Sequence, residues 1–171
     1  MNALASDFRQ RKNELLTQCA AEQSLSRAAL VQRHLRLLSD LCDDTLKELW
    51  LQADMPTSCA LLAVGGYGRQ ALFPYSDVDV LVLLPDTLSI EKDETIASRI
   101  ESFIGSCWDA GLEIGSSVRH LSECVSEAVA DITVQTAMLE SRSLTGNPDL
   151  LQAFAESLKK SLDPKAFFTG K

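Results

Sequence analysis

Two apolar segments joined by a glycine-rich turn constrain this chain more than any other feature. The first segment, 59–64, leads into Gly-Gly-Tyr-Gly at positions 65–68. The second segment, 78–84, begins directly after Asp77 and contains Asp79 at its second position. Both have the length and the continuous apolar character of buried strands. Side chains two residues apart on a strand point to the same face, so the two carboxylates are directed at one place.

The closeness of this carboxylate pair to the glycine-rich turn predicts a phosphate and metal site. Glycine leaves the backbone of a turn open to close approach by a phosphate group and tolerates a positive φ. Carboxylate oxygens bind Mg²⁺, which often bridges a protein and the phosphates of a nucleoside triphosphate. We therefore expect Asp77 and Asp79 to bind Mg²⁺. The triphosphate is expected at the glycines of the turn, Gly65, Gly66 and Gly68.

Each of these side chains also has a plainer interpretation. Asp77 and Asp79 could lie on a solvated edge strand, but a carboxylate pair at the start of so apolar a strand is costly unless it is paired or metal-bound. Arg69 follows the turn and could bind triphosphate oxygens or form a structural salt bridge. Ser76 could bind a phosphate or only its own turn. Both alternatives stay open for Arg69 and for Ser76.

The run 66–71 also fits G-x-G-x-x-A, a dinucleotide-binding fingerprint, and Asp86 follows at a suitable distance for a ribose contact. That interpretation requires a parallel crossover of about a dozen residues or more that includes a helix. The stretch between Arg69 and Asp77 is too short for one and contains Pro74. We therefore reject the dinucleotide fold.

Composition excludes several other classes of protein. The chain has 171 residues, a formal net charge of −8 and a pI near 4.7, which argues against binding to nucleic acid. No apolar run is long enough to span a membrane, and the N-terminus lacks the apolar core of a signal peptide. Five cysteines without a CxxC pair indicate reduced core residues, so we expect a cytoplasmic protein without a zinc site.

Hydrophobic periodicity predicts an α+β domain, α/β-like in its alternation, with a small mixed sheet flanked by helices. We expect an N-terminal helical segment over 1–55, a core over 56–145, and the start of a further helical region over 146–171. Ser122 is expected to cap one long helix that reaches Leu139, and Asn147 to cap a helix that begins at Pro148. The other expected helices cover about 4–21, 24–50 and 96–108, and a third strand covers 112–118.

The residues around the turn resemble a known family. The runs 65–69 and 76–79 are similar to the GG…DxD signature of the polymerase-β-type nucleotidyltransferase superfamily. From about Leu46 to Gly146, the order and spacing of further motifs resemble the N-terminal part of the bacterial PII uridylyltransferase/uridylyl-removing enzymes. These motifs are LKELW (46–50), WDAGLEIG (108–115), SVR (117–119), LSEC (121–124), DIT (131–133) and LESR (139–142).

The resemblance implies a nucleotidyltransferase fold and an Mg²⁺-dependent transfer of UMP from UTP to a tyrosine of the PII signal protein. It implies a third carboxylate on a neighbouring strand, for which Glu113 is the candidate and Asp131 the rival. It also makes Tyr67 a packing residue rather than the nucleophile. Ser116 and His120 depart from the family, which often has His and Thr there.

The resemblance further implies a longer protein, in which an HD hydrolase domain removes uridylyl groups and two ACT domains sense glutamine. We expect residues 1–171 alone to show little transfer activity. Two alternatives remain: another nucleotidyltransferase, either a protein adenylyltransferase or an antibiotic-modifying type, and a non-catalytic nucleotide-binding module. No motif visible in the sequence reads the base of the nucleotide.

Overall fold

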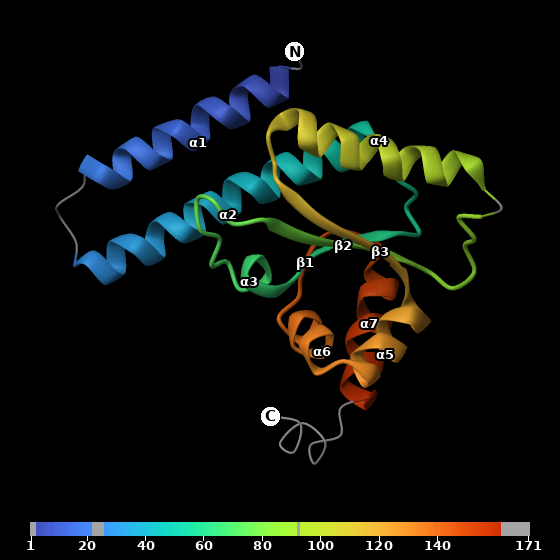
Figure 1. The fold of residues 1–171 in the computed structure, drawn as a ribbon. Coiled ribbons are helices and arrows are strands. Elements are labelled where there is room, and N and C mark those ends of the chain that lie inside the picture. The colour runs from blue at the N-terminus through green and yellow to red at the C-terminus, as the bar shows by residue number, and fades with distance from the viewer. Residues whose placement is uncertain (1–2, 22–25, 92, 162–171) are drawn as a thin grey trace.

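A computed structural model describes residues 3–21, 26–91 and 93–161 of the chain as helices around one sheet (Figure 1). The helices are α1 (Ala3–Ala21), α2 (Arg27–Gln52), α3 (Gly65–Gly68), α4 (Glu94–Ala110), α5 (Leu121–Ala130), α6 (Ile132–Leu139) and α7 (Pro148–Ser161). The strands are β1 (Ala60–Ala63), β2 (Val78–Leu84), β3 (Ile114–His120) and β4 (Arg142–Gly146). The predicted α+β class with a small mixed sheet is confirmed.

The sheet has the strand order β3-β2-β1-β4. β1 pairs antiparallel with both β2 and β4, whereas β2 and β3 are parallel and are connected through α4. The antiparallel pairing of β1 with β2 confirms that no dinucleotide-type crossover joins them. In the parallel pair, Asp79 lies opposite Gly115.

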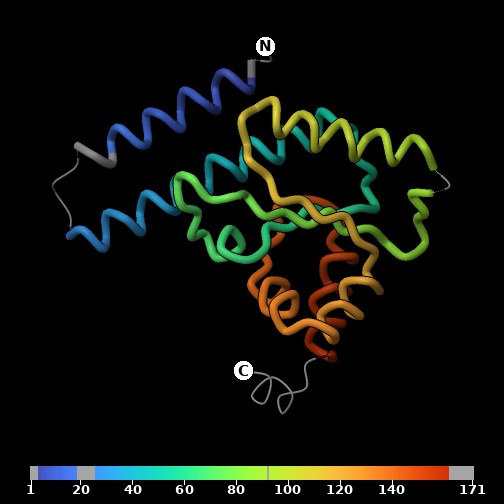
Figure 2. Tube along the Cα trace, in the orientation of Figure 1, coloured from blue at the N-terminus to red at the C-terminus, as the bar shows by residue number. Residues whose placement is uncertain are grey.

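The sheet separates two apolar layers, as Figures 1 and 2 show. On one face, side chains of α1, α2 and α4 pack against Val78, Val80 and Val82, with Trp50 and Phe103 in edge-to-face contact. On the other face, α5, α6 and α7 cover Leu81 and Leu83. β2 is therefore buried on both faces everywhere except at Asp79, near its start.

The elements begin and end at residues suited to those positions. Asn147 accepts hydrogen bonds from the backbone N–H groups of Asp149 and Leu150, so the predicted cap of α7 is confirmed. Gly111 ends α4 with a φ of 89°, a left-handed conformation that glycine adopts without strain. No helix in the described part of the chain is long and apolar enough to cross a membrane.

The single helix predicted over 122–139 is wrong. Asp131 has extended backbone angles and accepts hydrogen bonds from the N–H groups of Thr133 and Val134, which ends α5 and starts α6. α5 begins at Leu121 rather than after a Ser122 cap, because Glu123 folds back onto the N–H of His120. Ser122 instead binds the carboxylate of Asp86.

Other expectations from the sequence have mixed outcomes. β4 was not predicted, because only Leu144 of its five residues is buried and the strand lies at the sheet edge. α2 contributes to one apolar layer and α7 to the other, and the division into 1–55, 56–145 and 146–171 stays a prediction. The expectations for Ser24, the side chain of Cys19 and residues 162–171 lie outside the described residues. The remaining cysteines are buried free thiols: Cys42, Cys59, Cys107 and Cys124.

Candidate active site

The carboxylate of Asp79 lies in a recess formed by two glycines. A Cβ atom added to Gly115, on the adjacent strand, would lie 2.5 Å from Asp79 Oδ1. A Cβ added to Gly65 would lie 3.7 Å from Asp79 Oδ2. The space that the Asp79 carboxylate occupies therefore exists because position 115 has no side chain, and Gly65 lies near the other carboxylate oxygen.

The electrostatics of this recess favour a cation. Partial burial raises the pKa of Asp79, and the negative charge of Asp77 raises it further. Within the described part of the chain, no donor hydrogen-bonds to either carboxylate and no basic side chain pairs with them. Two neighbouring carboxylates without a cationic partner are the donor set that Mg²⁺ requires, so these residues fit the metal.

The glycine-rich turn is a short helix, α3, held against β2. The N–H of Val64 donates to the carbonyl of Asp79 at 3.0 Å, which fixes the start of the turn beside the carboxylate. Of the three glycines, only Gly65 has a positive φ, of 56°. Neither Gly66 nor Gly68 has a positive φ. Gly68 is required for another reason, because a Cβ there would lie 2.1 Å from the carbonyl oxygen of Glu140.

A buried polar network anchors this turn to the rest of the fold. Tyr67 is 1% exposed, and its hydroxyl donates to Asp43 Oδ1 at 2.5 Å. Arg142 donates to both oxygens of Asp43, at 2.5 and 2.9 Å, and its guanidinium lies 5.6 Å from the centre of the Tyr67 ring. Burial and the Asp43 charge raise the pKa of Tyr67, so its hydroxyl stays protonated and packs, as predicted, rather than reacting.

Sequence reasoning missed this network. Asp43 and Arg142 are 99 residues apart, and although Arg142 ends the LESR motif, no motif spacing pairs it with Asp43. The available signal was an acidic residue within the mainly apolar run of α2, where Asp43 is the buried charged side chain. A buried charge requires a partner, and the network supplies two.

For Arg69 and Ser76, the structure contains the plainer of the two alternatives. Arg69 forms a salt bridge with Glu140, which joins α3 to the end of α6. The Ser76 hydroxyl donates to the carbonyl of Phe73 at 3.0 Å within its own turn. Both side chains are at least partly exposed, and their contact with a triphosphate stays a prediction.

The third carboxylate also stays a prediction. Glu113 is exposed just before β3, where its carbonyl accepts the N–H of Val78 at 2.8 Å. Asp131 serves as the N-cap of α6, where its side chain accepts from the N–H groups of Thr133 and Val134. Among the described residues, no three acidic, histidine or cysteine side chains gather into a metal-binding group. The structure thus places the Asp79 carboxylate next to the glycine-rich turn, and the charge of Asp77 acts on it.

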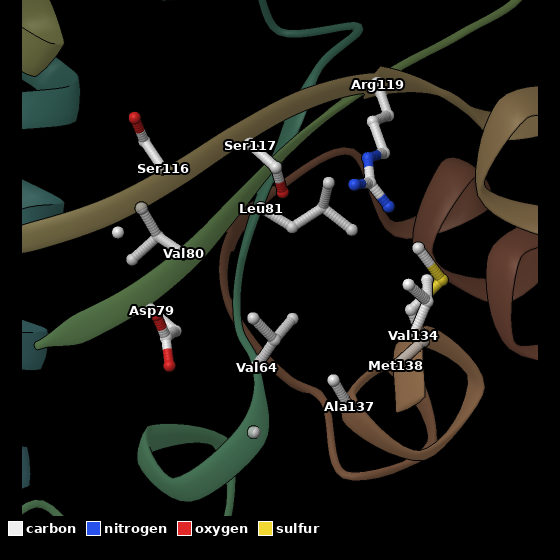
Figure 3. A pocket seen from close by; sticks show the side chains of 12 residues that line it. Val64, Asp79, Val80, Leu81, Ser116, Ser117, Arg119, Val134, Ala137 and Met138 are labelled. Atoms are coloured by element: carbon white, nitrogen blue, oxygen red, sulfur yellow. The ribbon is translucent and has the colours of Figure 1, made fainter. Parts of the chain in front are cut away.

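A cavity of about 360 Å³ opens beside Asp79 and extends along β3 beneath α6. Asp79 lies at one end of the cavity and Arg119 at the other (Figure 3). Gly65 and Gly115, which adjoin the Asp79 carboxylate, also line it. The Asp79 carboxylate, a glycine-rich turn and a cavity that accommodates an organic group therefore adjoin one another. This arrangement suits a nucleotide whose phosphates approach the turn.

Comparisons with known proteins agree with this chemistry. Residues 43–130 match the family described as "Nucleotidyltransferase domain". A curated protein of Burkholderia orbicola (strain AU 1054), named "Bifunctional uridylyltransferase/uridylyl-removing enzyme", is 46% identical over 166 residues, which is 97% of this chain. Proteins of the same name from Cupriavidus pinatubonensis and Nitrosospira multiformis are 57% identical over 75% and 48% identical over 87% of the chain.

The chain corresponds to a small part of these relatives. The aligned residues make up 18% of the Burkholderia protein, 14% of the Cupriavidus protein and 17% of the Nitrosospira protein. The similarity covers the carboxylate pair, the glycine-rich turn and the strand that carries Gly115, because all of them lie within residues 43–130.

Proposed function

Because this chain belongs to the nucleotidyltransferase domain family, we propose that it transfers a uridylyl group from UTP, with Mg²⁺, to a tyrosine hydroxyl of the PII signal protein. The carboxylate pair carries this proposal. The charge of Asp77 raises the pKa of Asp79, so the two carboxylates interact, and neither has a cationic partner in the described part of the chain. The Asp79 carboxylate also adjoins Gly65 of the turn. The name shared by the three relatives supports uridylyl as the transferred group.

In this proposal each part of the site has a distinct task. Asp77 and Asp79 hold Mg²⁺, which neutralises triphosphate charge and lowers the pKa of the attacking hydroxyl when it is bound. The backbone of 65–68 lies against the triphosphate, and the network of Asp43, Tyr67 and Arg142 keeps that backbone in place. Positioning and charge neutralisation account for most of the catalysis in transfers of this kind.

The chemical step is a substitution at phosphorus. The tyrosine oxygen of the acceptor forms a bond to the α-phosphorus of UTP, while the bond from that phosphorus to the bridging oxygen breaks. Pyrophosphate leaves with the electrons of the broken bond, and the hydroxyl proton passes to water. Uridylyl removal and glutamine sensing belong, in this proposal, to parts of a longer cytoplasmic protein outside residues 1–171.

Calorimetry with UTP, in the presence and absence of Mg²⁺, tests the binding half of the proposal. We expect the wild-type chain to bind UTP only when Mg²⁺ is present. For Asp79→Asn, we expect that adding Mg²⁺ no longer increases the affinity for UTP. Asp149→Asn is the matched control, because Asp149 is an exposed carboxylate in the first turn of α7. Equal Mg²⁺-dependent binding by Asp79→Asn and wild type would remove the metal assignment.

Radiolabelled UTP with purified PII protein tests the transfer half. The full proposal is supported if the longer natural protein transfers label to PII and its Asp79→Asn variant does not. Mg²⁺-dependent binding without label transfer by the longer natural protein would instead favour a nucleotide-binding module. Transfer of AMP from ATP in preference to UMP would assign the chain to the adenylyl-transferring class.

A further inference from the structure

The cavity beside Asp79 is lined very differently at its two ends. From the carboxylate it passes between Leu81 and Val64 on the sheet side and Val134, Ala137 and Met138 on α6. At its far end, Ser117 and Arg119 project from β3 into the same space (Figure 3). An apolar passage thus connects a metal-binding end to a hydrogen-bonding end.

The apolar walls determine which part of a nucleotide fits the passage. A triphosphate that lay along Leu81, Val64 and Met138 would lose its hydration without gaining donors, at a large cost in free energy. A planar base loses little there, because its faces are apolar and only its edge requires partners. The phosphates therefore remain at Asp79 and Gly65, and the base occupies the passage.

Arg119 is positioned to meet the edge of that base. Gly115, opposite Asp79, and Arg119 are four residues apart on β3, or about 13 Å at the usual rise of a strand. One nucleotide bridges such a span from its α-phosphate to the far edge of its base. The guanidinium forms a salt bridge with Glu127, which orients it and leaves further N–H groups directed toward the cavity.

We propose that Arg119, oriented by Glu127, selects the base of the nucleotide by donating hydrogen bonds to a carbonyl oxygen on its edge. The inference rests on the proposed function and specifies how that site distinguishes UTP from other triphosphates. Uracil presents its O4 carbonyl where cytosine presents a 4-amino group and adenine a 6-amino group, whereas the O2 carbonyl is common to uracil and cytosine. An arginine has donors only, so it binds the O4 carbonyl and repels the amino group. The Ser117 hydroxyl can bind either.

Calorimetry with Mg²⁺ and four probes tests this assignment: UTP, CTP, ATP and inorganic tripolyphosphate, which has no base. We expect Arg119→Gln to weaken UTP binding about tenfold, corresponding to the loss of about 1.4 kcal/mol, and to bring UTP and CTP to similar affinities. Tripolyphosphate should bind Arg119→Gln as it binds wild type, which also shows that the variant is folded. Arg119→Lys should lose most of the discrimination while keeping the charge.

Arg99→Gln is the matched control, because Arg99 pairs with Asp54 at 2.7 Å and does not line this cavity. The inference is overturned if Arg119→Gln keeps the preference for UTP over CTP. It is also overturned if the variant weakens tripolyphosphate equally, or if it raises only the KM for the acceptor protein. If wild type binds neither UTP nor tripolyphosphate with Mg²⁺, the proposed function itself fails.

Discussion

Replacement of Gly115 by alanine tests the central feature of the site, the recess that holds the Asp79 carboxylate. The added Cβ would lie 2.5 Å from Asp79 Oδ1, whereas Cβ atoms in proteins essentially never approach closer than 3.0 Å. Asp79 must therefore move by at least 0.5 Å, the difference between these two distances. Metal and catalytic groups tolerate displacements of about 0.5 Å, and one of about 1 Å can cost a hundredfold in rate.

We therefore expect Gly115→Ala to weaken Mg²⁺-dependent UTP binding about tenfold or more and to leave the fold intact. Gly105→Ala is the control, because nothing lies within 4 Å of a Cβ added at that position of α4. Alanine in a helix interior is favoured over glycine by about 0.5–1 kcal/mol, so the control should be slightly more stable and bind UTP normally. Wild-type affinity for Mg²⁺ and UTP in a folded Gly115→Ala would refute the recess as the metal site.

Three further outcomes are expected. In scanning fluorimetry without Mg²⁺, Asp79→Asn should have a higher Tm than wild type, because it removes a charge disfavoured by burial and by Asp77. Mg²⁺ should raise the Tm of wild type but not that of Asp79→Asn. The pKa of Asp79 is higher in the folded state than in the unfolded state. Below the pKa of the unfolded state the side chain is neutral and does not destabilise the fold, whereas above the pKa of the folded state it is charged and does. The Tm difference should therefore disappear in acid. Tyr67→Phe should lower the free energy of unfolding by about 2 kcal/mol in urea titrations, since it removes the hydroxyl that donates to buried Asp43.

The sequence sufficed for those parts of the fold where local pattern and tertiary environment agree. The apolar run of β2 and the cap at Asn147 were both predicted, because each depends on neighbours in the chain. The carboxylate pair was found for the same reason, since its two members are only two residues apart. Its role in metal binding stays a prediction.

Features that depend on distant partners were not predictable in the same way. β4 has the polar composition of a loop and becomes a strand because β1 offers it an open edge. The recess at Asp79 depends on Gly115, whose position opposite the carboxylate follows from the parallel register of β2 and β3. No spacing in the sequence indicates that register, so nothing in the sequence assigned Gly115 a place beside the carboxylate.

The buried network explains how a glycine-rich turn can hold a fixed shape. Glycine gives the turn its open backbone but also costs conformational entropy when the turn is ordered. Tyr67, in the middle of the turn, offsets this cost by inserting a fully buried ring and by donating to Asp43, which Arg142 holds with two further hydrogen bonds. The same turn binds the backbone of Asp79 through Val64. Its glycines can therefore leave space for a ligand because residues on α2 and β4 supply the rigidity that the glycines lack.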